Sequence, residues 1–303
     1  MILDDMDFGT WYAHATRRAD LRLRERVQTV MQGLHASTFR GRGEDFEFFQ
    51  PHALGEDTTH IDWKASERLE DGLLVRRLRE ERVLEVWIAA DLSASIFTGF
   101  SAEGCKQRLL LDLIAIVGRS VIGQQDLLGF VGFDRNIRTV MQPFRSEKTF
   151  VNLLQMIWEH QPESGAATAL LPVLRYFETQ EGTSQQKKKR LLLLLSDFES
   201  EDDWLPAAQR IRAMHPLLPV VLEEAVPEHL PTSAGVLTYR DVESGQLQTV
   251  DARAWLRLLH EERRERRQHY LTAFEASGLE GLFVSRQTFD VDAVIEYLEA
   301  QRP

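Results

Sequence analysis

Short, almost wholly apolar runs alternate with segments of helical spacing through the middle of the chain, and this alternation constrains the fold more than any other feature. Runs that are apolar at successive positions are typical of strands buried on both faces, which occur in parallel sheets covered by helices. The strand-like runs are 83–90, 127–133, 137–141, 191–195 and 217–222, and the helical segments are 105–122, 149–158, 170–177 and 203–214. The sequence therefore predicts an α/β protein with a doubly wound, mostly parallel sheet.

Two further parts of the chain set the predicted domain organisation. Residues 1–82 form an N-terminal segment, which the recurrence of apolar residues predicts to be helical over 10–36 and partly extended thereafter. The α/β domain spans 83–303 and contains an insertion, at about 225–275, made of a hairpin and a long helix. The elements predicted after the insertion are a strand at 281–285 and a helix at 291–298.

Composition and charge narrow the class of protein. Lys and Arg number 36 against 47 Asp and Glu, a formal net charge of −11, which argues against non-specific binding to nucleic acid or anionic lipid. Cys105 is the single cysteine, so an internal disulfide and a cysteine-based zinc site are excluded. No apolar run approaches the roughly 18–20 residues of a membrane span, and the acidic first residues do not resemble a secretory signal. We expect a cytoplasmic protein without membrane contact.

Polar side chains follow the apolar runs where the predicted strands end. Asp91, Ser93 and Ser95 come directly after the first run, and Asp197 follows the run of five leucines. Thr168 lies between them, before a helix. Because doubly wound sheets bind ligands beyond the carboxyl ends of their strands, we expect these side chains to converge. Their oxygens suit Mg²⁺, and also Mn²⁺ or Ca²⁺, although Asp and Ser after a strand also cap helices.

These five residues resemble the metal-ion-dependent adhesion site of von Willebrand factor A domains, through the D-x-S-x-S loop, the threonine and the second aspartate. The resemblance implies three neutral hydroxyl ligands and two carboxylates that bind the ion directly or through water. With few direct carboxylate ligands the ion stays electrophilic, so a Glu or Asp of a partner can complete its coordination. The departures from the usual pattern are Ala166, Ala167 and Ala169 around the threonine and Phe198 in place of a glycine.

A second resemblance covers the chain from about residue 20 to 300. The stretches 41–46, 55–68 and 74–82 are similar to the signature of the domain-of-unknown-function 58 family, which is von Willebrand factor A-like. Members are commonly associated with MoxR-type AAA+ ATPases, so the resemblance implies a partner or adaptor of such an ATPase, and of a client protein, in maturation or chaperone-like tasks. The candidates for partner contact are Asp62, Trp63 and Arg68, for which a core position or a structural ion pair is the alternative.

Two other functions are compatible with parts of the sequence. Magnesium and two aspartates could support a hydrolase or phosphatase, but phosphatases of the haloacid-dehalogenase type need a second Asp close after the first, where this chain has Ser and Ala. Nucleic acid could bind the basic clusters at 40–42, 76–79, 187–190 and 263–267. Most of these have acidic neighbours, and Glu262 is spaced to pair with Arg266, so solvated faces are the simpler interpretation. The sequence favours a non-catalytic, metal-dependent protein-interaction module.

Overall fold

The computed structural model describes residues 7–19, 42–51, 66, 73–79, 83–97, 106–163, 168–181, 190–224, 235–240 and 247–286. The chain forms two compact units, Met1–Gln28 with Leu84–Gln301 and Thr29–Val83 with Arg302–Pro303. The first unit takes in α1 (Phe8–Ala19), which the sequence grouped with the N-terminal segment. Several predictions lie outside the described residues, namely those for Asp62, Trp63, Arg68, the rest of the helix at 10–36 and the helix at 291–298.

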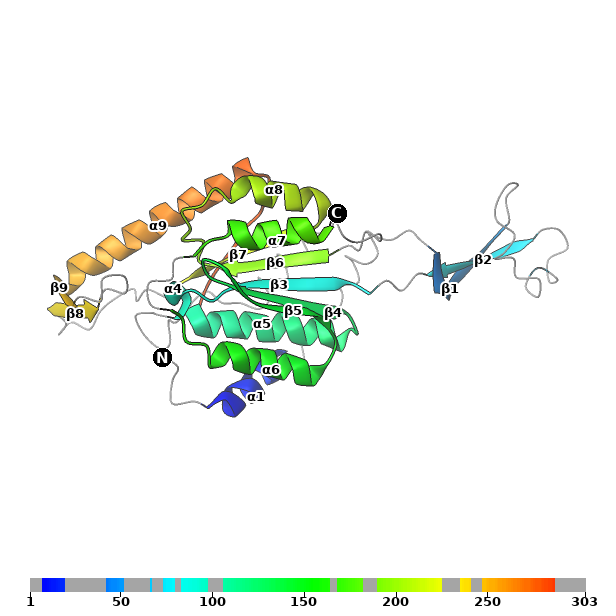
Figure 1. Ribbon diagram of the computed structural model, residues 1–303, viewed down its shortest axis with the longest axis horizontal. Helices are drawn as coiled ribbons and strands as arrows, with labels where there is room; N and C mark the ends of the chain where they lie inside the picture. Colours follow the sequence, from blue (N-terminus) through cyan, green and yellow to red (C-terminus); the bar gives the residue numbers. More distant parts are fainter. Residues whose placement is uncertain are drawn as a thin grey trace. The chain divides into compact units, whose positions relative to one another are not determined.

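A six-stranded sheet forms the centre of the first unit (Figure 1). Its strands are β3 (Glu85–Asp91), β4 (Leu127–Phe133), β5 (Ile137–Phe144), β6 (Arg190–Ser196), β7 (Leu217–Glu223) and β10 (Leu282–Ser285), in the order β10-β7-β6-β3-β4-β5. Neighbouring strands are parallel except for β5, which runs antiparallel to β4. Numbered by their order in the chain, these strands read 3-2-1-4-5-6, the doubly wound arrangement. The predicted fold class is confirmed.

The central strands are buried on both faces, as their apolar composition predicts. Every residue of β3 is buried, and β6 is buried after Arg190. The charged exception at the start of β3 is Glu85, whose carboxylate lies 3.3 Å from the Arg190 guanidinium at the start of β6. Gly129 of β4 is required by close packing, because a Cβ there would lie 2.4 Å from the Trp87 ring. The burial that the apolar sequence predicts is therefore observed along both central strands of the sheet.

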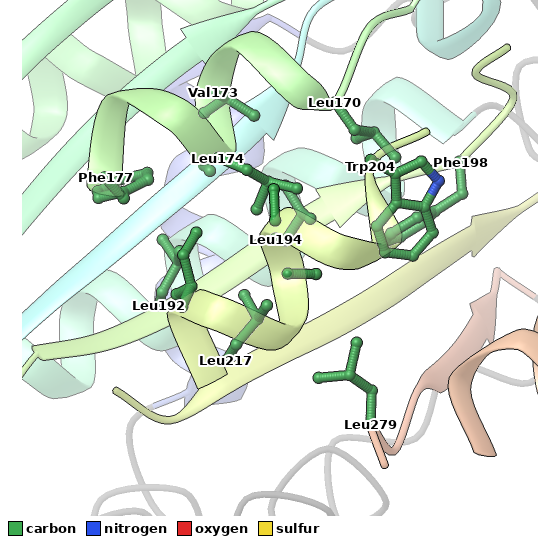
Figure 2. Packing of buried hydrophobic residues seen from close by; sticks show 14 of the residues in the cluster. Leu170, Val173, Leu174, Phe177, Leu192, Leu194, Phe198, Trp204, Leu217 and Leu279 are labelled. Atoms are coloured by element: carbon green, nitrogen blue, oxygen red, sulfur yellow. The ribbon is translucent and has the colours of Figure 1, made fainter. Parts of the chain in front are cut away.

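Helices cover both faces of this sheet (Figure 1). The bounds of the covering helices are Lys106–Gly123 for α5, Glu147–Trp158 for α6, Leu171–Glu181 for α7 and Leu205–Met214 for α8. On the α7 and α8 face, Leu174 and Phe177 belong to one hydrophobic cluster with Leu192 and Leu194 of β6 (Figure 2). On the other face α5 contacts β3 and β4, with α6 packed beside it. No helix among the described residues is both long and apolar enough to cross a membrane.

The N-terminal helix α1 packs on α5. Trp11 is fully buried, and its indole Nε1 donates a hydrogen bond to Asp112 Oδ1 of α5 at 2.8 Å. The Trp11 ring lies 5.4 Å from that of Trp158, and the Arg108 guanidinium sits over both rings. This aromatic and cationic contact fixes α1 to the sheet domain.

The predicted insertion lies between β7 and β10. Strands β8 (Val236–Arg240) and β9 (Leu247–Asp251) form an antiparallel hairpin. Asp251 then caps the long helix α9 (Ala252–Ala276), because its carboxylate accepts a hydrogen bond from the Ala254 amide at 2.8 Å. The chain afterwards returns to the sheet as β10, parallel to β7. The hairpin, the helix and the returning strand all match the sequence prediction.

The second unit contains one described ribbon. Strands β1 (Arg42–Pro51) and β2 (Leu74–Arg79) pair antiparallel, with Phe46 opposite Leu78 and irregular register near the start of β1. The short α4 (Ala94–Phe97) belongs to the first unit and follows β3 directly.

Candidate functional site

The candidate site lies where the two central strands of the sheet end. Asp91 is the last residue of β3, and Ser196 is the last residue of its parallel neighbour β6. From β3 the sheet grows through β4 in one direction, and from β6 it grows through β7 in the other. Doubly wound folds place their ligand sites beyond the carboxyl ends of such a strand pair. The loop that carries Asp91 and the loop that carries Asp197 therefore meet at this point.

Asp91 is fully buried and held by neutral donors. Its Oδ1 accepts a hydrogen bond from the Ser93 amide at 2.9 Å, and its Oδ2 accepts one from the Ser196 hydroxyl at 2.6 Å. The Thr168 hydroxyl oxygen also lies 3.1 Å from Oδ2. Among the described residues no cation contacts this carboxyl group, and the donors that are described are all neutral.

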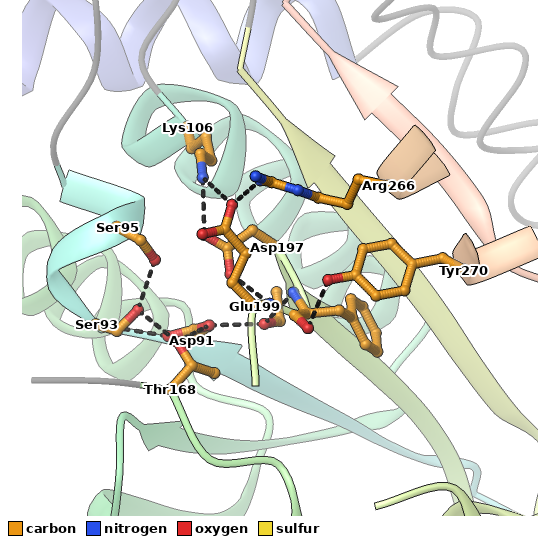
Figure 3. A network of polar contacts seen from close by, with 11 residues as sticks. Asp91, Ser93, Ser95, Lys106, Thr168, Asp197, Glu199, Arg266 and Tyr270 are labelled. Atoms are coloured by element: carbon orange, nitrogen blue, oxygen red, sulfur yellow. Dashed lines mark hydrogen bonds and ion pairs between the residues drawn. The ribbon is translucent and has the colours of Figure 1, made fainter. Parts of the chain in front are cut away.

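Hydroxyl groups extend from Asp91 as a chain of contacts (Figure 3). Thr168 Oγ1 lies 2.9 Å from Ser93 Oγ, and Ser93 Oγ lies 3.0 Å from Ser95 Oγ. Asp197 directly follows Ser196, whose hydroxyl donates to Asp91, and the Ser95 side chain helps to lower the pKa of the Asp197 carboxyl. The structure thus brings all five residues predicted from the sequence to the same network of polar groups.

Asp197, unlike Asp91, carries a counter-ion. The Lys106 ammonium, at the start of α5, lies 2.7 Å from Asp197 Oδ2, and both side chains are buried. The same ammonium is 3.9 Å from Glu199, which also forms an ion pair with Arg266 of α9. A chain of alternating charges therefore runs from the candidate site to the inserted helix.

The two aspartates differ in their electrostatics for this reason. Burial, with the nearby charge of Asp197, raises the pKa of Asp91 to about 7, although hydrogen bonds from Ser196 and Ser93 oppose the rise. Burial would also raise the pKa of Asp197, but the charge and hydrogen bond of Lys106 outweigh burial and lower it. Asp197 is therefore ionised at neutral pH, and Asp91 is poised between its two forms.

Phe198 has a strained backbone in the loop after β6. Its φ is +60°, a conformation that a bulky residue adopts at a cost and that glycine adopts freely. Its side chain is buried against Trp204 and Phe274, and the Tyr270 hydroxyl of α9 donates to its carbonyl at 2.7 Å. Packing and this hydrogen bond hold the conformation in place of the glycine that the metal-site pattern usually has.

Two residues of the network were not assigned from the sequence, Lys106 and Ser196. Ser196 is adjacent to Asp197, and this adjacency was the available signal. The sequence signal for Lys106 is weaker, because a lysine at the start of a largely apolar helix is equally consistent with a solvent-exposed helix end.

The capping interpretation of Asp197 is wrong, because α8 begins at Leu205 and its N-cap, Trp204, makes no side-chain cap bond. Arg266, spaced to pair with Glu262, forms an ion pair with Glu199.

The donor set suits a hard cation bound mainly by hydroxyls. Among the described residues no group of three or more His, Cys, Asp and Glu is placed to hold a metal, so a site here must use Ser and Thr oxygens. The oxygens of Asp91, Thr168, Ser93 and Ser95 are hydrogen-bonded to one another at 2.9, 3.0 and 3.1 Å, so they already lie side by side. Neutral hydroxyls beside a carboxylate are oxygen ligands of the kind that hard cations such as Mg²⁺ accept, and these residues therefore fit such an ion.

Sequence comparison relates the chain to proteins without known function. The model of the family described as "Protein of unknown function DUF58" matches residues 49–270, well over half of the chain. An uncharacterized protein of Mycobacterium tuberculosis (strain H37Rv) is 24% identical over 239 residues, which span 77% of this chain and 71% of that protein. An uncharacterized protein of Mycobacterium bovis matches to the same extent.

Structure comparison finds partial overlaps with solved proteins. BatB, a conserved hypothetical protein from Bacteroides thetaiotaomicron, overlaps with a TM-score of 0.43 at 14% identity over 72% of this chain and 96% of that one. An aerotolerance-related membrane protein from Bacteroides fragilis gives 0.43 at 17% identity, over 72% and 98% of the two chains. The SpRpn10 VWA domain gives 0.36 at 10% identity, over 48% and 77%.

Proposed function

Because this chain belongs to the DUF58 family, we propose that it is a non-catalytic protein-interaction module whose binding surface forms around a divalent cation at the carboxyl ends of β3 and β6. The residues that would hold the cation are Asp91, Ser93, Ser95, Thr168 and Asp197. The observation that carries the proposal is a row of three hydroxyl groups, those of Ser95, Ser93 and Thr168, that leads to a fully buried carboxyl group with no described counter-ion.

A buried carboxylate without a counter-ion is unfavourable, and a divalent cation removes this cost. Desolvation penalises the charged form of Asp91, as its raised pKa of about 7 indicates. A bound dication stabilises that charged form and draws the neutral hydroxyls into its coordination shell. Cation binding and ionisation of Asp91 are therefore expected to reinforce one another.

The partner that we propose offers a carboxylate. Few protein carboxylates are available to coordinate the ion, so an Asp or Glu from another protein can fill an open position with a net gain in charge balance. The resemblance of the sequence to MoxR-associated proteins leads us to propose a MoxR-type AAA+ ATPase as this partner, acting on a client protein.

A metal-dependent hydrolase is the second candidate, and one observation favours it. A pKa of about 7 would suit Asp91 to general acid–base chemistry. Against this, Asp91 is fully buried behind Ser196 and Thr168, which leaves it no direct access to a substrate. Steady hydrolysis of p-nitrophenyl phosphate by the wild type, lost in Asp91→Ala, would establish the enzyme instead.

Calorimetry of Mg²⁺ and Mn²⁺ binding tests the cation site. We expect Asp91→Ala to weaken binding at least about a hundredfold, because it removes the one carboxyl group that is not engaged by a lysine. Asp126→Asn is the matched control, since Asp126 is also a buried aspartate but accepts from the Leu84 amide at the opposite end of the sheet. If the wild type binds neither ion at millimolar concentration, either alone or with the ATPase present, the cation site does not exist.

Pull-down of a purified MoxR-type ATPase tests the partner. We expect capture by the wild type in Mg²⁺, loss of capture in EDTA, and loss in Asp91→Ala with the control Asp126→Asn unaffected. Capture that is equal in Mg²⁺ and EDTA would place the interface elsewhere, and the upstream block with Asp62, Trp63 and Arg68 would be the next candidate.

A further inference from the structure

Lys106 lies inside the candidate site although no function has been assigned to it. It is the first residue of α5, only 7% exposed, and its ammonium is 2.7 Å from Asp197 Oδ2 (Figure 3). A buried lysine is unusual unless it is paired, so the pair with Asp197 explains why the lysine is tolerated there.

The pairing changes what Asp197 can offer to a cation. Asp197 Oδ2 contacts the ammonium, and Oδ1 accepts a hydrogen bond from the Glu199 amide at 3.2 Å. Both oxygens of this carboxylate are therefore occupied. Of the two predicted carboxylate ligands, Asp197 is paired with a cation, whereas Asp91 has only neutral donors among the described residues.

We propose that Lys106 is a built-in counter-ion that withholds Asp197 from the divalent cation and so keeps cation affinity low until a partner supplies a carboxylate. This inference rests on the proposed function. A dication near Asp197 would be repelled by the ammonium, and both positive charges would compete for one carboxylate. A partner's carboxylate restores the missing negative charge, which makes cation binding and partner binding mutually dependent.

Removing the ammonium while keeping the length of the side chain gives the direct test. In Lys106→Met, Asp197 becomes available, and we expect the affinity for Mg²⁺ alone, measured by calorimetry, to rise about tenfold or more. The matched control is Arg190→Met, which removes the partly buried cation at the opposite ends of the same strand pair, 3.3 Å from Glu85. We expect the Mg²⁺ affinity of Arg190→Met to equal that of the wild type.

Thermal stability gives a second readout that needs no partner. In EDTA, Lys106→Met should lower Tm by about 10 °C, because it leaves a buried carboxylate unpaired. Added Mg²⁺ should restore most of that loss in Lys106→Met and none of the loss in Arg190→Met. A purely structural lysine would give equal losses in EDTA and in Mg²⁺, and that result would overturn the inference.

The outcomes separate this inference from the proposed function. Mg²⁺ binding by the wild type with no gain in Lys106→Met overturns the inference and leaves the cation site standing. Binding of Mg²⁺ alone by Lys106→Met but not by the wild type supports the inference. Binding by neither protein overturns both.

A double variant covers the case in which Lys106→Met does not fold. Lys106→Met with Asp197→Asn removes both charges of the pair, so Asp197 is not left as a buried charge without its counter-ion. We expect this protein to bind Mg²⁺ within about threefold of the wild type, because a carboxylate that the lysine withholds contributes little to binding. Loss of binding in the double variant would show that Asp197 serves the cation despite Lys106, and would overturn the inference.

Discussion

The two ends of β3 and β6 carry buried charges in different arrangements. At the amino ends, Glu85 pairs with Arg190 at 3.3 Å, one carboxylate against one guanidinium. At the carboxyl ends, two buried carboxylates, Asp91 and Asp197, meet one buried cation, Lys106, and a group of hydroxyls. Glu85 and Arg190 therefore match one another in charge, whereas the carboxyl ends hold one more buried carboxylate than buried cation.

This difference distinguishes buried charged groups that stabilise the fold from buried charged groups that serve a function. A balanced pair needs nothing further, and such pairs are commonly structural. A surplus carboxylate with a pKa near 7, surrounded by neutral oxygens, has an incomplete environment that a ligand can complete. The functional end of the sheet is therefore distinguished by an excess of buried carboxylates over buried cations, and the presence of buried charge alone does not distinguish it.

The largest effect is expected from breaking the balance at the amino ends. Arg190→Met removes the guanidinium beside the buried Glu85 carboxylate, so it should lower the free energy of unfolding by about 3–5 kcal/mol, measured by urea denaturation. Adding Glu85→Leu should recover the loss to within about 1 kcal/mol of the wild type, because both charges are then gone. A loss below about 1 kcal/mol in the single variant would mean that the two ends do not differ as described.

The second effect is a pH dependence at the carboxyl ends. The pKa of Asp91 rises from 3.8 to about 7 on folding, so the folded state holds this proton more tightly than the unfolded state does. The stability that this proton provides is present below about pH 4 and is lost as pH rises to about 7. In EDTA at pH 8, Asp91→Asn should therefore be more stable than the wild type by about 2–4 kcal/mol.

Thermal melts of both proteins from pH 4 to 8 give this measurement. The difference in Tm should grow with pH in EDTA and shrink in Mg²⁺, which stabilises the charged carboxylate. A difference that is constant across this range would show that Asp91 does not titrate in the window, and the surplus charge at the site would be absent.

The smallest effect concerns how α9 supports the loop after β6. Tyr270→Phe removes the hydrogen bond to the Phe198 carbonyl and should cost about 1 kcal/mol by urea denaturation. Tyr176→Phe, on α7, is the control for loss of a tyrosine hydroxyl. If Tyr270→Phe also weakens Mg²⁺ binding, α9 positions Asp197 for the cation; unchanged binding would restrict its role to stability.

The sheet could be predicted from the sequence because each strand is encoded locally. The run 127–133 coincides with β4, and the run 217–222 lies within β7, since both are apolar at successive positions. The five polar residues could also be placed together, because strand ends that share an edge follow from the parallel order. What the sequence shows well is which residues are buried and where each buried run ends.

The remainder depends on contacts between distant residues. Lys106 and Asp197 are 91 positions apart. The residues next to Lys106 in the sequence do not indicate whether its side chain is buried beside the sheet or exposed to solvent. The ion pair between Arg266 and Glu199 similarly depends on how α9 crosses the loop after β6. The backbone of Phe198 follows from the packing of its ring, whereas residue type alone favours a negative φ.

The placement of β10 at the edge of the sheet has a consequence for how the chain folds. Leu282 pairs with Val220, so about sixty residues of hairpin and helix separate two adjacent strands. Closing a loop of that size is slow unless its contents are already ordered, and the 25-residue α9 can form from local contacts. We therefore expect β10 to join late in refolding, after α9 has shortened the distance that the chain ends must close. A polypeptide released before this last strand would expose the edge of β7 and be prone to aggregate.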